Sequence, residues 1–105
     1  MRDWGSIVTV SCLSGVPGAE KFPGMAAYVA AKSGLAGLTE ALAVEGRPLG
    51  IRVNAVSPGA IDTPMLKLSG VAGRKFEPAQ VARIVAWLAT PDSAPLTGAN
   101  LRLEP

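Results

Sequence analysis

The sequence predicts an α/β fold in which a parallel sheet of about three strands packs with two long helices. Three short segments rich in β-branched or apolar residues alternate with two longer segments that have the composition or spacing of helices. This alternation is typical of parallel sheets, because each helix carries the chain back to the start of the next strand. Three strands and two helices leave sheet edges uncovered. We therefore expect the 105 residues to be part of a larger domain.

The first half of the chain predicts a strand, a loop and a helix. Residues 6–10, Ser-Ile-Val-Thr-Val, are short, apolar and β-branched, which is typical of a strand buried on both faces. Glycines and prolines indicate a loop over residues 13–27. Residues from about 26 to 45 are rich in Ala and Leu and lack proline, which indicates a helix. Glycine and proline within 46–50 end this helix.

The second half predicts a strand, a helix and a last strand. A strand is expected over residues 51–56, and the proline-glycine pair at 58–59 ends it. Residues 60–75 have no clear period and indicate a mobile loop or short helices. A helix is expected from 77–78 onward, with proline in its first turn. Its apolar residues recur at spacings of three and four, at Val81, Ile84, Val85 and Leu88. Residues 100–103 predict the last short strand.

Composition limits the class of function. Hydrophobic residues make up 49% of the chain and charged residues 17%, which is too apolar for a disordered tail. The net charge is +2 and the ten basic residues are scattered, so we expect no nucleic-acid partner. No apolar run approaches the roughly 18 residues that a membrane span needs, and the first residues do not resemble a signal peptide. We expect no membrane association and a cytoplasmic location.

The absence of histidine excludes several kinds of site. Ser-His-Asp triads, Cys-His dyads and histidine-ligated metals all require this residue, so we expect no metal. Cys12 is the only cysteine, so no intrachain disulfide can form, which fits a reducing compartment.

A tyrosine and a lysine one helical turn apart are candidate acid/base groups. Tyr28 and Lys32 occupy positions i and i+4 of the predicted helix, which lie on the same face. A cation about 4–5 Å from a phenol, at an effective dielectric near 20, favours the phenolate by roughly 3–4 kcal/mol. The pKa of the phenol would then fall by roughly two to three units from about 10, close to the pH at which acid/base catalysis is most effective. Taken alone, such a pair is more often a surface pair in which the lysine stem packs along the protein than a functional one.

Three segments carry a resemblance to a known family. Residues 5–15 run as a strand into a serine-containing turn, residues 27–39 contain the Tyr28–Lys32 pair, and residues 50–59 read Gly-Ile-Arg-Val-Asn-Ala-Val-Ser-Pro-Gly. In this order and at these spacings they resemble the short-chain dehydrogenase/reductase family, from residue 5 to about 103. The resemblance implies a Rossmann-type, doubly wound sheet, with residues 1–105 as the C-terminal part of one domain. It also implies NAD or NADP as cofactor and hydride transfer between an alcohol and a ketone.

The family's site residues map onto positions of this sequence. The resemblance implies that Tyr28 exchanges the proton at the substrate oxygen, and that Lys32 lowers the tyrosine pKa and binds the nicotinamide ribose. The turn after the second strand is expected to pass the nicotinamide, and two residues beyond it to contact the carboxamide; without the resemblance, the turn would be an ordinary strand end. The implied cofactor-binding residues are Tyr28, Lys32, Pro58, Gly59, Ile61 and Thr63.

The residue expected to hold the substrate carbonyl departs from the family pattern. Relatives usually have Ser-Ser after this strand, whereas this chain has Ser11-Cys12, so that Cys12 occupies the catalytic serine position. A thiol is a weaker hydrogen-bond donor than a hydroxyl, and loss of a good donor costs about one to three kcal/mol. Ser14 is the alternative, because the loop before Tyr28 is a few residues longer than usual. Cys12 is equally interpretable as a small buried residue at a strand end.

The nucleotide-binding half of the family pattern has no counterpart in these residues. The glycine-rich turn that binds the pyrophosphate is missing, and so is the residue that selects NAD or NADP. We therefore expect the 105-residue chain to be inactive by itself. The alternative to an oxidoreductase is a truncated non-catalytic remnant or a module that pairs with another subunit. For the full-length form we expect a small-molecule alcohol or carbonyl substrate and a homo-oligomer.

Overall fold

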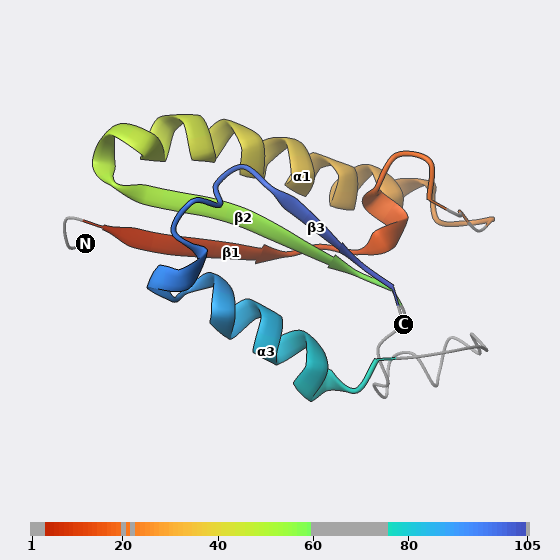
Figure 1. The fold of residues 1–105 in the computed structure, drawn as a ribbon. Coiled ribbons are helices and arrows are strands. Elements are labelled where there is room, and N and C mark those ends of the chain that lie inside the picture. Colours follow the sequence, from red (N-terminus) through yellow and green to blue (C-terminus); the bar gives the residue numbers. More distant parts are fainter. Residues whose placement is uncertain (1–3, 20, 22, 60–75, 105) are drawn as a thin grey trace.

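The computed structural model describes residues 4–104 except 20, 22 and 60–75. Three parallel strands form one sheet in the order β1-β2-β3, with α1 on one face and α3 on the other (Figure 1). The strands are β1 (Gly5–Val10), β2 (Ile51–Pro58) and β3 (Asn100–Leu103), and the helices are α1 (Ala26–Gly46) and α3 (Pro78–Leu88). Three single turns of 3-10 helix join them, η1 (Leu13–Gly15), η2 (Arg47–Leu49) and η3 (Pro91–Ser93). The predicted α/β fold, three-stranded parallel sheet and two helices are confirmed.

The strand order makes β2 the central strand of the sheet. Val10 of β1 lies opposite Val56 of β2, and Leu101 of β3 lies opposite the same valine. Side chains alternate between the two faces of a strand, so every second residue of β2 points to α3 and the others to α1. Because all three strands are parallel, their carboxyl ends lie at one edge of the sheet.

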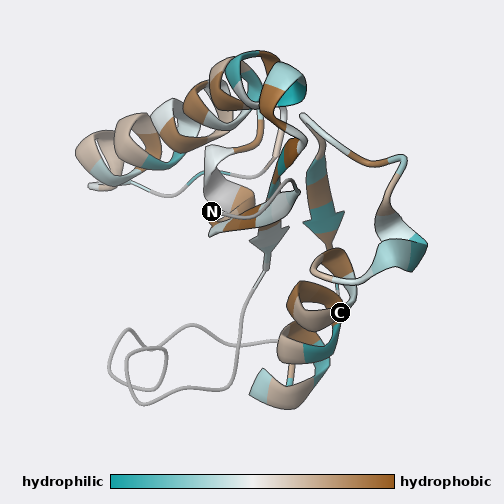
Figure 2. Ribbon diagram, turned by 90° about the vertical axis from the view of Figure 1, so that its left-hand side faces the viewer, coloured by the Kyte–Doolittle hydropathy of each residue, from teal (hydrophilic) through white to brown (hydrophobic). Residues whose placement is uncertain are grey.

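Each helix covers its own face of the sheet. On the α3 side, Val56, Val81 and Leu88 form the buried core, and partly buried apolar residues of β1 and β3 pack around it. On the other side α1 packs along β2 and buries Thr39 and Ala43. Figure 2 shows the two helices on opposite sides of the strands, with apolar or weakly polar residues along most of α1. No helix in the described ranges is long and apolar enough to cross a bilayer.

One expectation about β1 is wrong. The sequence predicts a strand buried on both faces, but Ile7 is 38% exposed and Val10 is 49% exposed. Among the described residues β1 pairs only with β2, so it is an edge strand whose outer neighbour is not within the described sheet. A run of β-branched residues indicates that a strand is made for burial, and it does not show whether neighbouring elements are present to bury it.

Arg52 fastens the end of α3 to the sheet. From β2 its Nη1 donates to the carbonyl oxygen of Ser93 at 2.7 Å, and its Nη2 donates to the carbonyl oxygens of Leu88 and Thr90, both at 3.2 Å. From β1, Ser6 Oγ donates to the same Leu88 oxygen at 2.8 Å. Carbonyl groups at the C-terminus of a helix have no partner within the helix, so these donors satisfy them while they join α3 and η3 to β2.

We expect Arg52→Ala to lower the free energy of unfolding by about 2–4 kcal/mol, because several half-buried carbonyl oxygens lose a charged donor. Arg52→Lys should lose an intermediate amount, since an ammonium cannot reproduce the guanidinium fork. Urea unfolding followed by circular dichroism measures both. Arg102→Ala is the matched control: its guanidinium pairs with exposed Glu104 at 3.2 Å, a contact worth at most about 1 kcal/mol. Equal losses for the two alanine variants would contradict the role of Arg52.

Candidate active site

The first two turns of α1 bring Tyr28 and Lys32 together. Gly24, at a φ of 83°, turns the chain just before the helix, and Met25 is the N-cap residue. From there the helix runs without proline, so Tyr28 lies in its first turn and Lys32 one turn further. The Lys32 Nζ lies over the Tyr28 ring, 5.6 Å from the ring centroid, within the range of a cation–π contact. The expected placement on one helix face is confirmed.

Cys12, which follows β1, lies beside Tyr28. It follows that strand directly, and its extended backbone (φ −150°, ψ 147°) leads into η1. The N–H of Ser11 donates to Val56 O at 2.8 Å, which extends the ladder one residue beyond β1. The side chain of Cys12 is hydrogen-bonded to Tyr28. The structure therefore brings together Cys12, Tyr28 and Lys32, whereas the side chain of Ser14 lies outside the described part.

The partial burial of Tyr28 and its interaction with Cys12 together raise the pKa of its phenol to about 12. Partial burial is the largest cause, followed by the hydrogen bond with the Cys12 side chain and the charge interaction with Cys12. A hydrogen bond that raises the pKa of a phenol favours the neutral form, in which the Tyr28 hydroxyl can donate to the Cys12 sulfur. The phenol is therefore neutral at neutral pH.

The expected lowering of this pKa by Lys32 is wrong for the described structure. That expectation assumed an ammonium about 4–5 Å from the phenol. In the structure the ammonium lies over the ring, 5.6 Å from its centroid, and the causes of the shift are burial and Cys12, which all raise the pKa. Spacing in the sequence predicts a shared helix face, but the orientation of the two side chains decides the direction of the pKa shift.

The turn after β2 lies at the same edge of the sheet. Pro58 is buried and ends β2, and the N–H of Gly59 donates to Leu103 O at 2.9 Å. Because Val10 pairs with Val56, continuing the register places Cys12 level with Pro58. The other two expected cofactor-binding residues, Ile61 and Thr63, lie outside the described residues.

Sequence reasoning missed two serines that join the Cys12 loop to α1. Ser11 Oγ donates to Lys32 O at 3.1 Å, and Ser33 Oγ donates to Gly15 O at 3.0 Å. A Cβ on Gly15 would lie 2.8 Å from the backbone carbon of Lys32, so the loop approaches the helix as closely as glycine permits. The glycine after the turn was the available signal, because glycine often marks a close approach of backbone.

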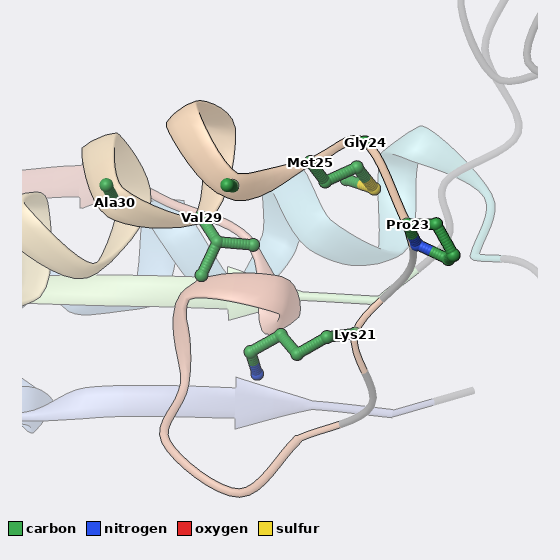
Figure 3. A pocket seen from close by; sticks show the side chains of 7 residues that line it. Lys21, Pro23, Gly24, Met25, Val29 and Ala30 are labelled. Atoms are coloured by element: carbon green, nitrogen blue, oxygen red, sulfur yellow. The ribbon is translucent and has the colours of Figure 1, made fainter.

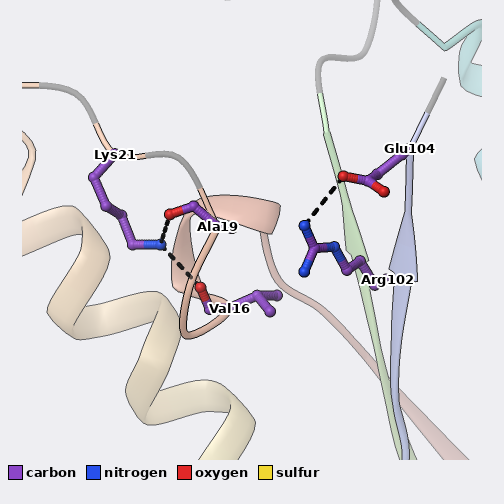
Figure 4. Close-up of polar contacts among 5 residues, drawn as sticks. All are labelled: Val16, Ala19, Lys21, Arg102 and Glu104. Carbon is purple, nitrogen blue, oxygen red and sulfur yellow. Dashed lines mark hydrogen bonds and ion pairs between the residues drawn. The ribbon is translucent and has the colours of Figure 1, made fainter.

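A hollow of about 540 Å³ lies between the first turns of α1 and the loop before it (Figure 3). Val29 lines it and follows Tyr28 in the helix, so the two side chains point about 100° apart. Lys21 lines the opposite side, and its Nζ donates to Val16 O at 2.9 Å and Ala19 O at 2.6 Å (Figure 4). The Lys21 ammonium therefore binds carbonyl groups of its own loop, and the residues around the hollow are mainly apolar.

Comparisons with known proteins identify the family. A family model described as Enoyl-(Acyl carrier protein) reductase matches residues 1–104. A trans-4-hydroxycyclohexanecarboxylate dehydrogenase of Sinomonas cyclohexanicum is 38% identical, over 95% of this chain and 40% of the relative. A cyclohexanol dehydrogenase of an Acinetobacter species is 40% identical, over 91% of this chain and 40% of the relative.

Solved structures give the same result for the fold. A 3-oxoacyl-[acyl-carrier protein] reductase from Brucella melitensis has a TM-score of 0.77 and 34% identity, over 95% of this chain and 41% of its own. An acetoin dehydrogenase from Enterobacter cloacae has a TM-score of 0.80 and 33% identity, over 94% and 42%. The chain thus spans about two fifths of the length of these proteins. With a family match over nearly all its residues, the chain belongs to the short-chain dehydrogenase/reductase family of oxidoreductases.

Proposed function

We propose that the complete protein is an NAD(P)-dependent oxidoreductase that interconverts an alcohol and a ketone, with Tyr28 as the acid/base residue. The observation that carries this proposal is the meeting of three side chains, Cys12, Tyr28 and Lys32, at the carboxyl edge of the sheet. Two matched relatives are named as dehydrogenases of hydroxylated six-membered rings. Their names support a small alcohol or ketone as the substrate class.

The residues present fit the nicotinamide end of the cofactor. Among the described residues no hydrogen bond or ion pair engages the Lys32 ammonium, so its three N–H donors are available to ribose hydroxyls. Gly59 has no side chain to obstruct a flat ring at the same sheet edge. A nicotinamide cofactor, when bound, supplies or accepts the hydride. No Gly-x-Gly-x-x-Gly run for the pyrophosphate occurs in the 105 residues.

The raised pKa supports a role for Tyr28 as the proton donor. Its neutral phenol donates a proton to the substrate oxygen during reduction. To do so, the substrate oxygen must replace the Cys12 sulfur as the acceptor of the Tyr28 hydroxyl. The S–H of Cys12 then serves as the second donor at that oxygen, in the role that a serine hydroxyl fills in relatives.

A subunit-pairing module is the second candidate, and the outer surface of α1 favours it. Leu38 is 52% exposed and Val44 is 69% exposed on this helix, although helices with apolar residues all round are normally buried. Pairing through α1 is compatible with catalysis in a homo-oligomer. Sedimentation of the 105-residue chain, compared with a Leu38→Glu/Val44→Glu variant, separates a pairing module from a monomer.

The pKa of Tyr28 is directly measurable, because it is the single tyrosine of the chain. We expect the tyrosinate absorbance, read just after a pH jump, to rise with a midpoint near 12. Cys12→Ala should move the midpoint toward 10, because the hydrogen bond and the charge of Cys12 are lost. A midpoint at or below 10 in the unmodified chain would contradict the proposed donor role.

The same shift makes stability depend on pH. The pKa of Tyr28 is higher in the folded chain than the value near 10 expected when unfolded. Its contribution to the free energy of unfolding is therefore complete below pH 10 and is lost as the pH rises from about 10 through 12. Tyr28→Phe should reduce this alkaline slope in chemical unfolding, and an unchanged slope would mean that other groups cause it.

In a full-length form that supplies the nucleotide-binding half, we expect Tyr28→Phe to lower kcat by about 10²–10⁴-fold, because the proton donor is lost. NAD(P)H binding should stay near normal. Lys32→Ala should weaken cofactor binding as well as turnover, since its donors contact the ribose in this proposal. Steady-state kinetics and fluorescence titration measure the two effects, and full turnover by the Tyr28→Phe enzyme would refute the assignment.

The 105-residue chain by itself should bind NADH and NADPH weakly, because it has no glycine-rich turn for the pyrophosphate. Titration of nicotinamide fluorescence measures this binding. A low-micromolar dissociation constant for either nucleotide would overturn the expectation.

A further inference from the structure

We infer that Ser11 and Ser33 are positioning residues that clamp the loop carrying Cys12 onto the helix turn after Tyr28, and so hold the Cys12 thiol within reach of the Tyr28 hydroxyl. The catalytic meaning of this clamp rests on the proposed function, but its geometry does not. Neither serine touches the substrate or the cofactor in the proposal. Each acts through the placement of Cys12.

The two hydrogen bonds run in opposite directions between the same two segments. The loop hydroxyl of Ser11 donates to the helix at Lys32 O, at 3.1 Å, and the helix hydroxyl of Ser33 donates to the loop at Gly15 O, at 3.0 Å. The two loop anchors lie on either side of Cys12, one residue before it and three after it. The loop is therefore held at both ends of the short stretch that presents the thiol.

Close packing at Gly15 sets the distance between the Cys12 loop and α1. A Cβ on Gly15 would lie 2.8 Å from both the backbone carbon and the Cβ of Lys32, so no larger residue fits without moving the loop away. On its other side the loop is tied to the sheet, because Ser11 N donates to Val56 O at 2.8 Å. Cys12 is thus fixed relative to β2 and α1 at once.

The backbone of α1 does not need the hydrogen bond from Ser11 to satisfy its carbonyl groups. Lys32 lies inside α1, where its carbonyl oxygen already accepts the helix N–H four residues further on. The additional bond from Ser11 therefore docks the loop and does not rescue an unpaired group. A thiol makes weaker hydrogen bonds than a hydroxyl, so the Cys12–Tyr28 contact depends more strongly on accurate placement than a serine contact would.

The ionisation of Tyr28 reports directly on this placement. Within the described part of the chain, the titratable groups that face the phenol are Lys32 on α1 and Cys12 on the loop. The clamp substitutions do not change Lys32, which lies on α1 together with Tyr28. Partial burial is the largest cause of the raised pKa. Displacement of Cys12 is therefore measured by the part of the change that disappears when the same substitution is made in the Cys12→Ala background.

The experiment titrates Tyr28 in the 105-residue chain after Ser11→Ala, Ser33→Ala or both. We expect the tyrosinate midpoint to move from near 12 toward 10, as in Cys12→Ala, and to move no further when the serine changes are added to Cys12→Ala. Ser33→Thr, which keeps the hydroxyl, should restore the midpoint. Ser6→Ala is the matched control: it removes a 2.8 Å bond from a hydroxyl to Leu88 O on the far face of the sheet and should leave the midpoint unchanged.

Circular dichroism of each variant distinguishes displacement from unfolding. Folded clamp variants with the unmodified midpoint would overturn the inference. An equal shift in Ser6→Ala, or a shift that accompanies loss of helix, would show a general structural role and also overturn it. None of these readings involves turnover, so they are independent of the Tyr28→Phe test. In a full-length enzyme the clamp variants should lower kcat several-fold with KM little changed.

Discussion

Because β1, β2 and β3 run parallel, the segments that follow them all begin at the same edge of the sheet. The loop with Cys12 follows β1, the Pro58–Gly59 turn follows β2, and the helix with Tyr28 begins where the first loop returns. The candidate residues are far apart in the sequence, and this common direction brings them near one another. The same pairing leaves α1 and α3 on opposite faces, so that α3 packs against one side of the sheet while α1 carries the candidate residues Tyr28 and Lys32 on the other.

The Cys12–Tyr28 contact gives the site a different resting state from the one that sequence spacing suggests. The phenol is held neutral by partial burial and by its hydrogen bond to sulfur, and the ammonium of Lys32 lies over the ring. This arrangement suits a group that releases a proton only when a better acceptor displaces the sulfur. In the proposed mechanism, a cysteine at this position therefore affects both the substrate oxygen and the acid that protonates it.

Local patterns in the sequence were sufficient for the fold. The Ala- and Leu-rich run over 26–45, the spacing of Val81, Ile84, Val85 and Leu88, and the β-branched runs each specify an element through contacts between near neighbours, and all are confirmed. The exposure of β1 was not predictable in this way, because it depends on which strands surround it. The direction of the Tyr28 pKa shift and the bonds of Ser11 and Ser33 depend on side-chain orientation between segments 18 and 21 residues apart. The roles of Ile61 and Thr63 stay predictions.

The open side of β1 has a practical consequence for the chain in solution. Among the described residues, one row of backbone N–H and C=O groups along this strand faces no partner strand, and Ile7 and Val10 flank it. An unpaired strand edge is a template for another strand. Because such an edge-to-edge contact need not close on itself, it favours open-ended assemblies over defined dimers. Association of the 105-residue chain should therefore increase steeply with its concentration, and Ile7→Lys should oppose it by placing a charge beside the open edge.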